Sequence, residues 1–196
     1  MSEWIGELAA VRQLPRLAVR APRLLAQRRG HGEPVMVLPG RGVGDASTAP
    51  LRAYLVALGY RCRGWGLGVD DGDMDRLVPG VSAALLAMVG DDGRPVALVG
   101  QSLGGYVARE VARDHPELVS QVITIGTPIF GARSSRSLRR PVTAIASRAD
   151  RIVSWSRAFD RSPEATNVEV ASTHMGMGID PDVWRVVANT LRSSDG

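Results

Sequence analysis

The segment PVALVGQSLGGYVAREVARDHPE, residues 95–117, constrains the fold of this chain more than any other part of its sequence. An apolar run, a short turn and a helical pattern follow one another in it without a linker. In the turn, Gly100 and Gly104 each lie two residues from Ser102. Glycines at this spacing suit a strand that turns sharply into a helix, because side chains there would collide. The segment therefore predicts a strand–turn–helix unit that raises the Ser102 hydroxyl above the end of the strand.

The same alternation of apolar runs and helical patterns continues along the chain from residue 34. Short apolar runs bounded by turn residues are typical of strands buried on both faces of a sheet. We predict strands at residues 34–39, 60–66, 95–100, 119–128, 141–147 and 167–172. Helical patterns are found at residues 49–59, 74–90, 103–115, 154–160 and 181–193. This order predicts the α/β class, with a doubly wound, mostly parallel sheet of about six strands.

Residues 1–30 are expected to form a helical arm that packs on a domain formed by residues 31–196. In the arm, apolar residues recur every three or four positions and arginines fall between them, with Pro15 and Pro22 as interruptions. A basic amphipathic segment of this kind also allows weak contact with an anionic membrane surface. Packing on the domain is the favoured interpretation, because Trp4 is the only aromatic anchor in the arm.

The composition argues against several other classes of protein. No apolar run is long enough to cross a bilayer, and the N-terminus lacks the pattern of a secretory signal. The single cysteine, Cys62, cannot form an internal disulfide, so we expect a cytoplasmic protein. The net charge is +4 and every one of the 24 basic residues is Arg, but no aromatic residues lie among the densest basic clusters. We therefore expect no nucleic-acid partner.

Three residues with complementary chemistry each follow a different predicted strand. Ser102 follows the run at 95–100, Asp150 the run at 141–147, and His174 the run at 167–172. The carboxyl ends of parallel strands meet at one edge of a sheet, so these side chains are expected to lie together. A neutral imidazole can accept the serine proton, and a carboxylate can orient the imidazole and stabilise its charged form. The three residues predict a site for nucleophilic catalysis.

Structural roles are the alternatives for these side chains. Ser102 could be a turn residue, Asp150 could cap the helix that follows it, and His174 could be a hydrogen-bonded core residue. A cluster of carboxylates precedes the serine and lacks the ligand spacing of a calcium loop. We interpret this cluster as a turn and a helix N-cap, and expect no metal site; its members are Asp70, Asp71, Asp73 and Asp75.

The pentapeptide Gly100-Gln101-Ser102-Leu103-Gly104 resembles the nucleophile elbow of the α/β-hydrolase family, whose chain order of serine, acid and histidine is also found here. The likeness extends from about residue 34 to residue 193 and is greatest to small lipases and esterases. It implies a minimal α/β-hydrolase fold, with a catalytic domain over residues 31–196. It also implies that the backbone N–H groups of Leu103 and Arg41 stabilise an oxyanion. Pro39-Gly40 stands where the family often has His-Gly.

The resemblance implies a serine carboxylic-ester hydrolase that acts through an acyl-enzyme on a small ester, without cofactor or metal. Twelve residues, 129–140, separate the strands at 119–128 and 141–147, too few for a helical lid. An open cleft and short or medium acyl chains are therefore expected. The lining of this cleft is expected to include Trp65, Phe130, Trp155 and Met175. The alternatives are an acyltransferase or a thioesterase with the same triad, or a non-catalytic binding protein with this fold; the oligomeric state is not indicated.

Overall fold

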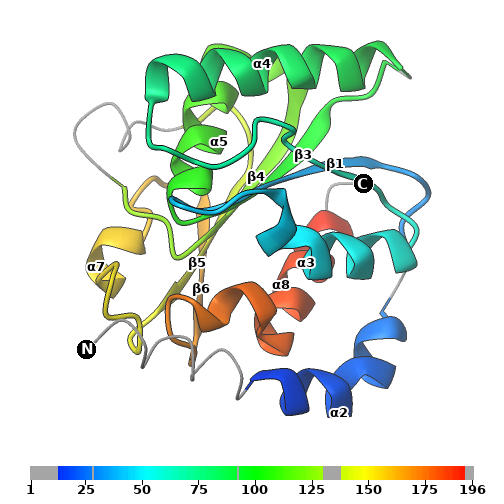
Figure 1. Ribbon diagram of the computed structural model, residues 1–196, viewed down its shortest axis with the longest axis vertical. Coiled ribbons are helices and arrows are strands. Elements are labelled where there is room, and N and C mark those ends of the chain that lie inside the picture. The colour runs from blue at the N-terminus through cyan, green and yellow to red at the C-terminus, as the bar shows by residue number, and fades with distance from the viewer. Residues whose placement is uncertain (1–12, 28, 92, 130–137, 193–196) are drawn as a thin grey trace.

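The computed structural model describes residues 13–27, 29–91, 93–129 and 138–192 (Figure 1). Its centre is a sheet of six strands in the order β2-β1-β3-β4-β5-β6. Every neighbouring pair of strands is parallel, so the predicted α/β class and doubly wound sheet are confirmed. The strands are β1 (Pro34–Leu38), β2 (Arg61–Gly64), β3 (Val96–Gln101), β4 (Val119–Ile125), β5 (Val142–Ser147) and β6 (Ala165–Val170).

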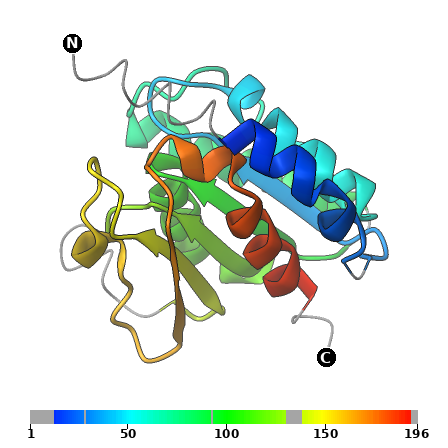
Figure 2. The same ribbon diagram turned by 90° about the horizontal axis from the view of Figure 1, so that it is seen from below.

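Helices cover both faces of this sheet, as Figures 1 and 2 show. The α-helices are α2 (Gln13–Leu25), α3 (Asp45–Ala57), α4 (Met74–Gly90), α5 (Leu103–Asp114), α7 (Trp155–Ala158) and α8 (Pro181–Arg192). The described residues also contain two short 3₁₀ helices, η1 (Pro116–Leu118) and η2 (Gly176–Ile179). Helices α4 and α5 pack on one face, and α2, α3 and α8 lie on the other side.

The side chains of β1 explain why its sequence is continuously apolar. Successive side chains of a strand point to opposite faces of the sheet. Val35 and Val37 pack in the core beneath α3 and α8, whereas Met36 and Leu38 pack in the core beneath α4 and α5. All four side chains are at most 1% exposed. Two buried faces therefore require an unbroken apolar run, as in parallel sheets generally.

Helix α3 begins earlier than the sequence predicts. Its first residue is Asp45 rather than residue 49, and Thr48 lies inside the helix with its Oγ1 donating to the Asp45 carbonyl. The Asp45 carboxylate accepts the backbone N–H groups of Trp65 and Gly66, both at 3.0 Å. This contact holds the start of α3 against the end of β2. Its partners are twenty residues away, so the local pattern could not indicate the boundary.

Helix α2 is the described part of the predicted N-terminal arm, and residues 1–12 lie outside the described residues. Pro15 lies in its first turn, where a missing N–H removes no helical hydrogen bond. Pro22 is tolerated near the other end of the helix. Leu24 is 4% exposed in the core, and the Tyr54 hydroxyl donates to its carbonyl at 3.3 Å. Within the described part of the chain, no helix is both long and apolar enough to cross a membrane.

Candidate active site

The turn between β3 and α5 holds Ser102 in a strained backbone conformation. Its φ is +51°, and it is the only non-glycine residue with a positive φ among those that the structure describes. Its N–H donates to the Ile125 carbonyl at 2.8 Å, which fixes the turn against β4. A Cβ on Gly100 would overlap the backbone of Gly105, and a Cβ on Gly104 would overlap the Pro39 carbonyl. Close backbone approach is therefore the physical reason for both glycines.

Ser102, His174 and Asp150 form a continuous chain of hydrogen bonds. His174 Nε2 lies 3.0 Å from Ser102 Oγ, and His174 Nδ1 lies 2.7 Å from Asp150 Oδ2. Asp150 and His174 are each 7% exposed, whereas Ser102 is half-buried and faces the solvent in part. The structure thus brings together the three side chains that the sequence analysis selected. The arrangement allows the imidazole to accept the serine proton while the carboxylate faces its other nitrogen.

The second oxygen of Asp150 explains how the carboxylate is oriented. Asp150 Oδ1 accepts the backbone N–H groups of Ile152 and Val153, both at 2.8 Å. The N-cap position of the helix that follows is occupied by Ser154, so Asp150 does not serve as its N-cap. These two amide bonds fix the plane of the carboxylate and leave Oδ2 facing the imidazole.

Two residues that the sequence analysis did not select support this pair. Ser147, 1% exposed, accepts with its Oγ the N–H groups of Ala149 at 3.0 Å and Ser172 at 3.2 Å. It therefore ties the loop before Asp150 to the loop before His174. Gly126, with a φ of +55°, follows β4, and a Cβ there would lie 3.3 Å from both Asp150 Oδ2 and His174 Nδ1. It lies inside the strand predicted at 119–128, and a glycine within a strand pattern is the only sequence signal that could have indicated it.

The expected oxyanion donors lie on the two sides of Ser102. Leu103 is the first residue of α5, and the first N–H groups of a helix have no acceptor within the helix. On the other side, a Cβ on Gly40 would lie 3.3 Å from the Cβ of Ser102, so the β1 loop passes directly beside the serine. The Arg41 N–H, next in this loop, has no hydrogen-bond acceptor among the described residues, and its side chain is exposed.

Asp70 anchors the loop that contains Arg41. The N–H of Gly42 donates to the Asp70 carbonyl at 2.7 Å, and the N–H of Asp70 donates to the Val43 carbonyl at 3.0 Å. The Asp70 side chain is fully buried, and this burial raises the pKa of its carboxyl, although an N–H bond from Gly72 opposes the shift. Backbone pairing rather than a histidine therefore orients this loop, which has Pro39-Gly40 in place of His-Gly.

The side chains that were expected to contact substrate lie in different surroundings. Trp65 is 1% exposed and packs in the core with its Nε1 donating to the Gly68 carbonyl, so it does not line an open cleft, and that expectation is wrong. The half-buried Trp155 packs against Phe159, with 4.9 Å between ring centroids. Met175, beside His174, is 45% exposed. Phe130 lies outside the described residues.

The acidic cluster at residues 70–75 serves the backbone, as the sequence analysis proposes. Asp73 is the N-cap of α4 and accepts the N–H groups of Asp75 and Arg76. Asp71 accepts the N–H of Asp73 and pairs with the Arg76 guanidinium at 3.0 Å. In residues 13–27, 29–91, 93–129 and 138–192, no group of three or more His, Cys, Asp or Glu side chains is arranged to hold a metal ion.

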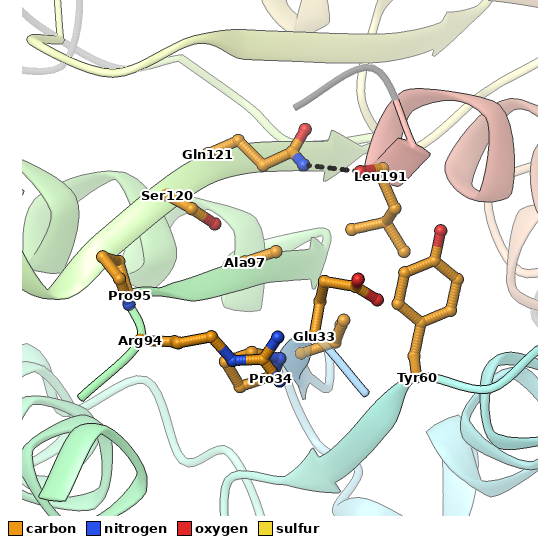
Figure 3. Close-up of a pocket in the computed structure, with 10 residues that line it drawn as sticks. Glu33, Pro34, Tyr60, Arg94, Pro95, Ala97, Ser120, Gln121 and Leu191 are labelled. Carbon is orange, nitrogen blue, oxygen red and sulfur yellow. Dashed lines mark hydrogen bonds between the residues drawn. The ribbon is translucent and has the colours of Figure 1, made fainter. Parts of the chain in front are cut away.

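A cavity of about 290 Å³ lies at the amino ends of β1, β3 and β4, shown in Figure 3. Glu33, Tyr60 and Arg94 are among its lining side chains, and Gln121 Nε2 donates across it to the Leu191 carbonyl at 3.4 Å. Ser102 follows the carboxyl end of β3, so this cavity is at the opposite edge of the sheet. It is separate from the candidate active site.

Known proteins resemble this chain in part of the sequence and most of the fold. No family model matches the sequence. A Mycobacterium tuberculosis protein that carries the name non-heme bromoperoxidase BpoC is 34% identical over 106 residues, which are 50% of this chain and 39% of that protein. The chain thus matches well under half the length of this curated relative. The crystal structure of BpoC superposes with a TM-score of 0.70 at 18% identity, covering 86% of this chain and 95% of that one.

Two further solved structures have the same architecture. MGS-MChE2, an α/β-hydrolase enzyme from a sediment metagenome of the Mar Chica lagoon in Morocco, has a TM-score of 0.67 at 17% identity and covers 86% of this chain and 94% of that one. The monoacylglycerol lipase of Paleococcus ferrophilus has a TM-score of 0.66 at 14% identity, with coverages of 84% and 97%. Together with the parallel sheet and the strained turn at Ser102, these likenesses identify the architecture. The chain has the α/β-hydrolase fold.

Proposed function

We propose that this protein is a serine carboxylic-ester hydrolase that acts through an acyl-enzyme on short- to medium-chain esters. The observation that carries the proposal is the hydrogen-bonded chain from Ser102 Oγ through His174 to Asp150, with distances of 3.0 and 2.7 Å. A serine hydroxyl is a weak nucleophile unless a base accepts its proton, and the neutral imidazole supplies that base. The names of the structural neighbours, which include an α/β-hydrolase enzyme and a monoacylglycerol lipase, support hydrolysis.

In the proposed acylation, Ser102 Oγ attacks the ester carbonyl carbon while its proton moves to His174 Nε2. The carbonyl oxygen becomes an oxyanion, which the N–H groups of Leu103 and Arg41 stabilise. Collapse of this intermediate breaks the bond to the alkoxy group, and His174 gives the same proton to the departing alcohol. Asp150 holds the imidazole in one tautomer and stabilises its charged form. Ser102 is then acylated.

In the proposed deacylation, water replaces the alcohol. His174 accepts a proton from the water as its oxygen attacks the acyl carbon, and a second oxyanion forms at the same N–H groups. When this intermediate collapses, the bond to Ser102 Oγ breaks and the proton returns to the serine. The products are a carboxylic acid and the free enzyme. An acyl acceptor other than water would make the same enzyme a transferase.

The length of the connection between β4 and β5 supports the proposed preference for short and medium chains. Only residues 126–141 join these strands, and residues 130–137 lie outside the described part. Met175 and Ile152, on the two loops that carry the base and the acid, are exposed apolar side chains available to an acyl group. Each methylene of the acyl chain contributes about 0.8 kcal/mol to binding when it is buried against apolar protein surface. A small apolar contact area can bury only a few methylenes, so it favours a short acyl chain.

The test is hydrolysis of p-nitrophenyl esters from acetate to palmitate by the wild type and Ser102→Ala. We expect turnover that is greatest with short or medium chains and is lost in the variant. A fluorophosphonate probe should label the wild type and not Ser102→Ala. Turnover that rises toward palmitate would contradict the size preference. Equal inactivity of both proteins, with no labelling, would reject ester hydrolysis; bromide oxidation would then be tested, because of the name of BpoC.

A further inference from the structure

Helix α2 lies directly against the segment that carries His174. We call residues 171–180 the His174 loop; it runs from the end of β6 through η2. Gln13, 8% exposed, donates from its Nε2 to Ser172 Oγ at 3.5 Å, and a Cβ on Gly176 would lie 3.7 Å from its Cγ. Figure 2 shows α2 in blue beside the orange and red segment from η2 to α8. The N-terminal arm is therefore part of the surroundings of His174.

Arg16 makes the charged contact between α2 and Asp180 at the end of this loop, and both Arg16 and Arg20 of α2 pair with Asp182 at the start of α8. Arg16 Nη1 lies 3.4 Å from Asp180 Oδ2 and 2.7 Å from Gln13 Oε1, and its Nη2 lies 3.1 Å from Asp182 Oδ2. Asp180 is 1% exposed, and its Oδ1 accepts the N–H of Asp182 at 2.8 Å. A buried carboxylate is costly unless a cation and hydrogen bonds satisfy it. Arg16 therefore stabilises the position of Asp180, where the loop ends.

The His174 loop is held on two sides. From the sheet, Ser147 Oγ accepts the N–H of Ser172 at 3.2 Å. From the outer side, Gln13 contacts Ser172 and Arg16 contacts Asp180, so α2 meets the loop on both sides of His174 in the sequence. Between these points the loop contains only the 3₁₀ turn η2. We propose that Arg16 is a positioning residue of the active site, which holds the His174 loop so that the imidazole reaches Ser102.

This proposal rests on the proposed function, because the position of His174 affects turnover only if His174 accepts the serine proton. Proton transfer is sensitive to small displacements, and a misplacement of about 1 Å can lower a rate about 100-fold. Loss of Arg16 would loosen the loop without removing any group that contacts substrate. The expected effect is therefore on kcat rather than on KM.

The experiment compares Arg16→Ala, Arg16→Lys and Arg23→Ala in the full chain, with p-nitrophenyl butyrate as substrate. Arg23 is an exposed arginine of the same helix, so it is a control for loss of charge from α2. We expect kcat to fall about tenfold in Arg16→Ala with KM within about twofold of the wild type. Lysine keeps the charge but cannot contact two carboxylates through separate nitrogens, so Arg16→Lys should retain at least about a third of the wild-type kcat. Arg23→Ala should match the wild type.

Hydrogen–deuterium exchange of the peptide that covers residues 171–180 gives a readout that needs no substrate. We expect faster exchange in Arg16→Ala than in the wild type or Arg23→Ala, while the peptides of β3 and β4 remain unchanged. Unchanged kcat together with unchanged exchange would overturn the proposal, as would equal losses of kcat in Arg16→Ala and Arg23→Ala. If the wild type hydrolyses no ester, the proposed function fails. Faster loop exchange in Arg16→Ala would then still support the structural contact, and equal exchange would reject it.

Discussion

The hydroxyl of Ser147 accepts the backbone N–H of Ser172 at 3.2 Å and so joins the end of β5 to the His174 loop. Ser147→Ala would leave this buried N–H without its acceptor, which costs about 1–3 kcal/mol, whereas water can accept the N–H of the exposed Ala149. We expect a lower Tm and a lower kcat, measured by thermal denaturation and ester hydrolysis. Ser156→Ala, at an exposed position of α7, is the control and should change neither. Wild-type values in Ser147→Ala would show that the hydroxyl is dispensable.

Gly126→Ala should lower turnover by more than its loss of stability can explain. A Cβ at this position would lie 2.6 Å from Met177 Cε and 3.3 Å from Asp150 Oδ2 and His174 Nδ1. We expect kcat to fall by about 100-fold because the base and the acid are displaced. The positive φ adds about 1–2 kcal/mol of destabilisation. Gly93→Ala is the matched control, since Gly93 also has a positive φ but a Cβ there would meet no heavy atom of the described residues within 4 Å. It should lose similar stability and keep full activity.

Asp150→Asn should abolish most of the turnover while the fold is kept. An asparagine can still accept the N–H groups of Ile152 and Val153, but its amide group would face His174 Nδ1 as a donor and favour the wrong tautomer. In serine proteases the equivalent change lowers kcat by about 10⁴-fold, and we expect a loss of about 10³- to 10⁴-fold here. Steady-state kinetics and a melting curve measure the two effects. A loss of less than about tenfold would exclude Asp150 as the acid.

The buried pair of Arg109 and Asp160 predicts the response of stability to acid. Burial alone would raise the pKa of the Asp160 carboxyl, but hydrogen bonds from Ser162 and the Arg109 guanidinium lower this pKa below its ordinary value. A carboxyl with a lower pKa in the folded state stabilises the protein fully above its unfolded-state pKa. That stabilisation is lost as the pH falls through the folded-state pKa.

Asp160→Asn is therefore expected to cost about 3–5 kcal/mol at pH 7, because it removes one partner of a buried ion pair. Urea denaturation at pH 7 and at pH 3 measures the free energy of unfolding of both proteins. The difference between them should shrink at pH 3, which lies below the ordinary carboxyl pKa of 3.8, because the unfolded wild type then binds a proton that the folded state takes up less readily. If the difference in the free energy of unfolding is the same at both pH values, the charge of Asp160 does not contribute to stability.

Cys62 should react slowly with thiol reagents in the folded protein. Burial raises the pKa of its thiol to about 12, and the nearby Arg52 only partly opposes this shift. The thiolate is the reactive form, so little of it is present at pH 8. We expect iodoacetamide to modify the native protein far more slowly than the urea-unfolded protein, as followed by mass spectrometry. Equal rates would mean that the thiol is accessible in the native state.

The sequence predicted the sheet and the three central residues because each depends on a local signal. Apolar runs mark the strands, and the turn at Ser102 requires glycines at fixed positions. Asp150 and His174 were found because each directly follows a strand. The residues that support them were missed. Ser147 and Gly126 act through contacts with residues more than twenty positions away, such as Ser172 and Asp150, and no local pattern encodes those contacts.

Trp65 illustrates the opposite error. It follows a predicted strand, as Ser102, Asp150 and His174 do, and it was expected in the cleft for that reason. The Trp65 indole is instead buried in the core cluster that also contains Leu77 and Val81 of α4. A large aromatic side chain gains more from full burial than from an exposed wall. A position just after a strand therefore places the backbone of a residue at the carboxyl edge of the sheet, but packing decides where its side chain points.

The order of the strands has a consequence for how the proposed activity would be acquired during folding. Strand β1 pairs with β3 and not only with its neighbour in the chain, and the contact between Ser102 and His174 spans 72 residues. Contacts between distant residues require the closure of long loops, which makes them slow to form. The turn at Ser102 is held by β4 and by the loop after β1, and His174 reaches it only when β5, β6 and the His174 loop are in place. Recovery of turnover after dilution from denaturant therefore reports completion of the whole sheet.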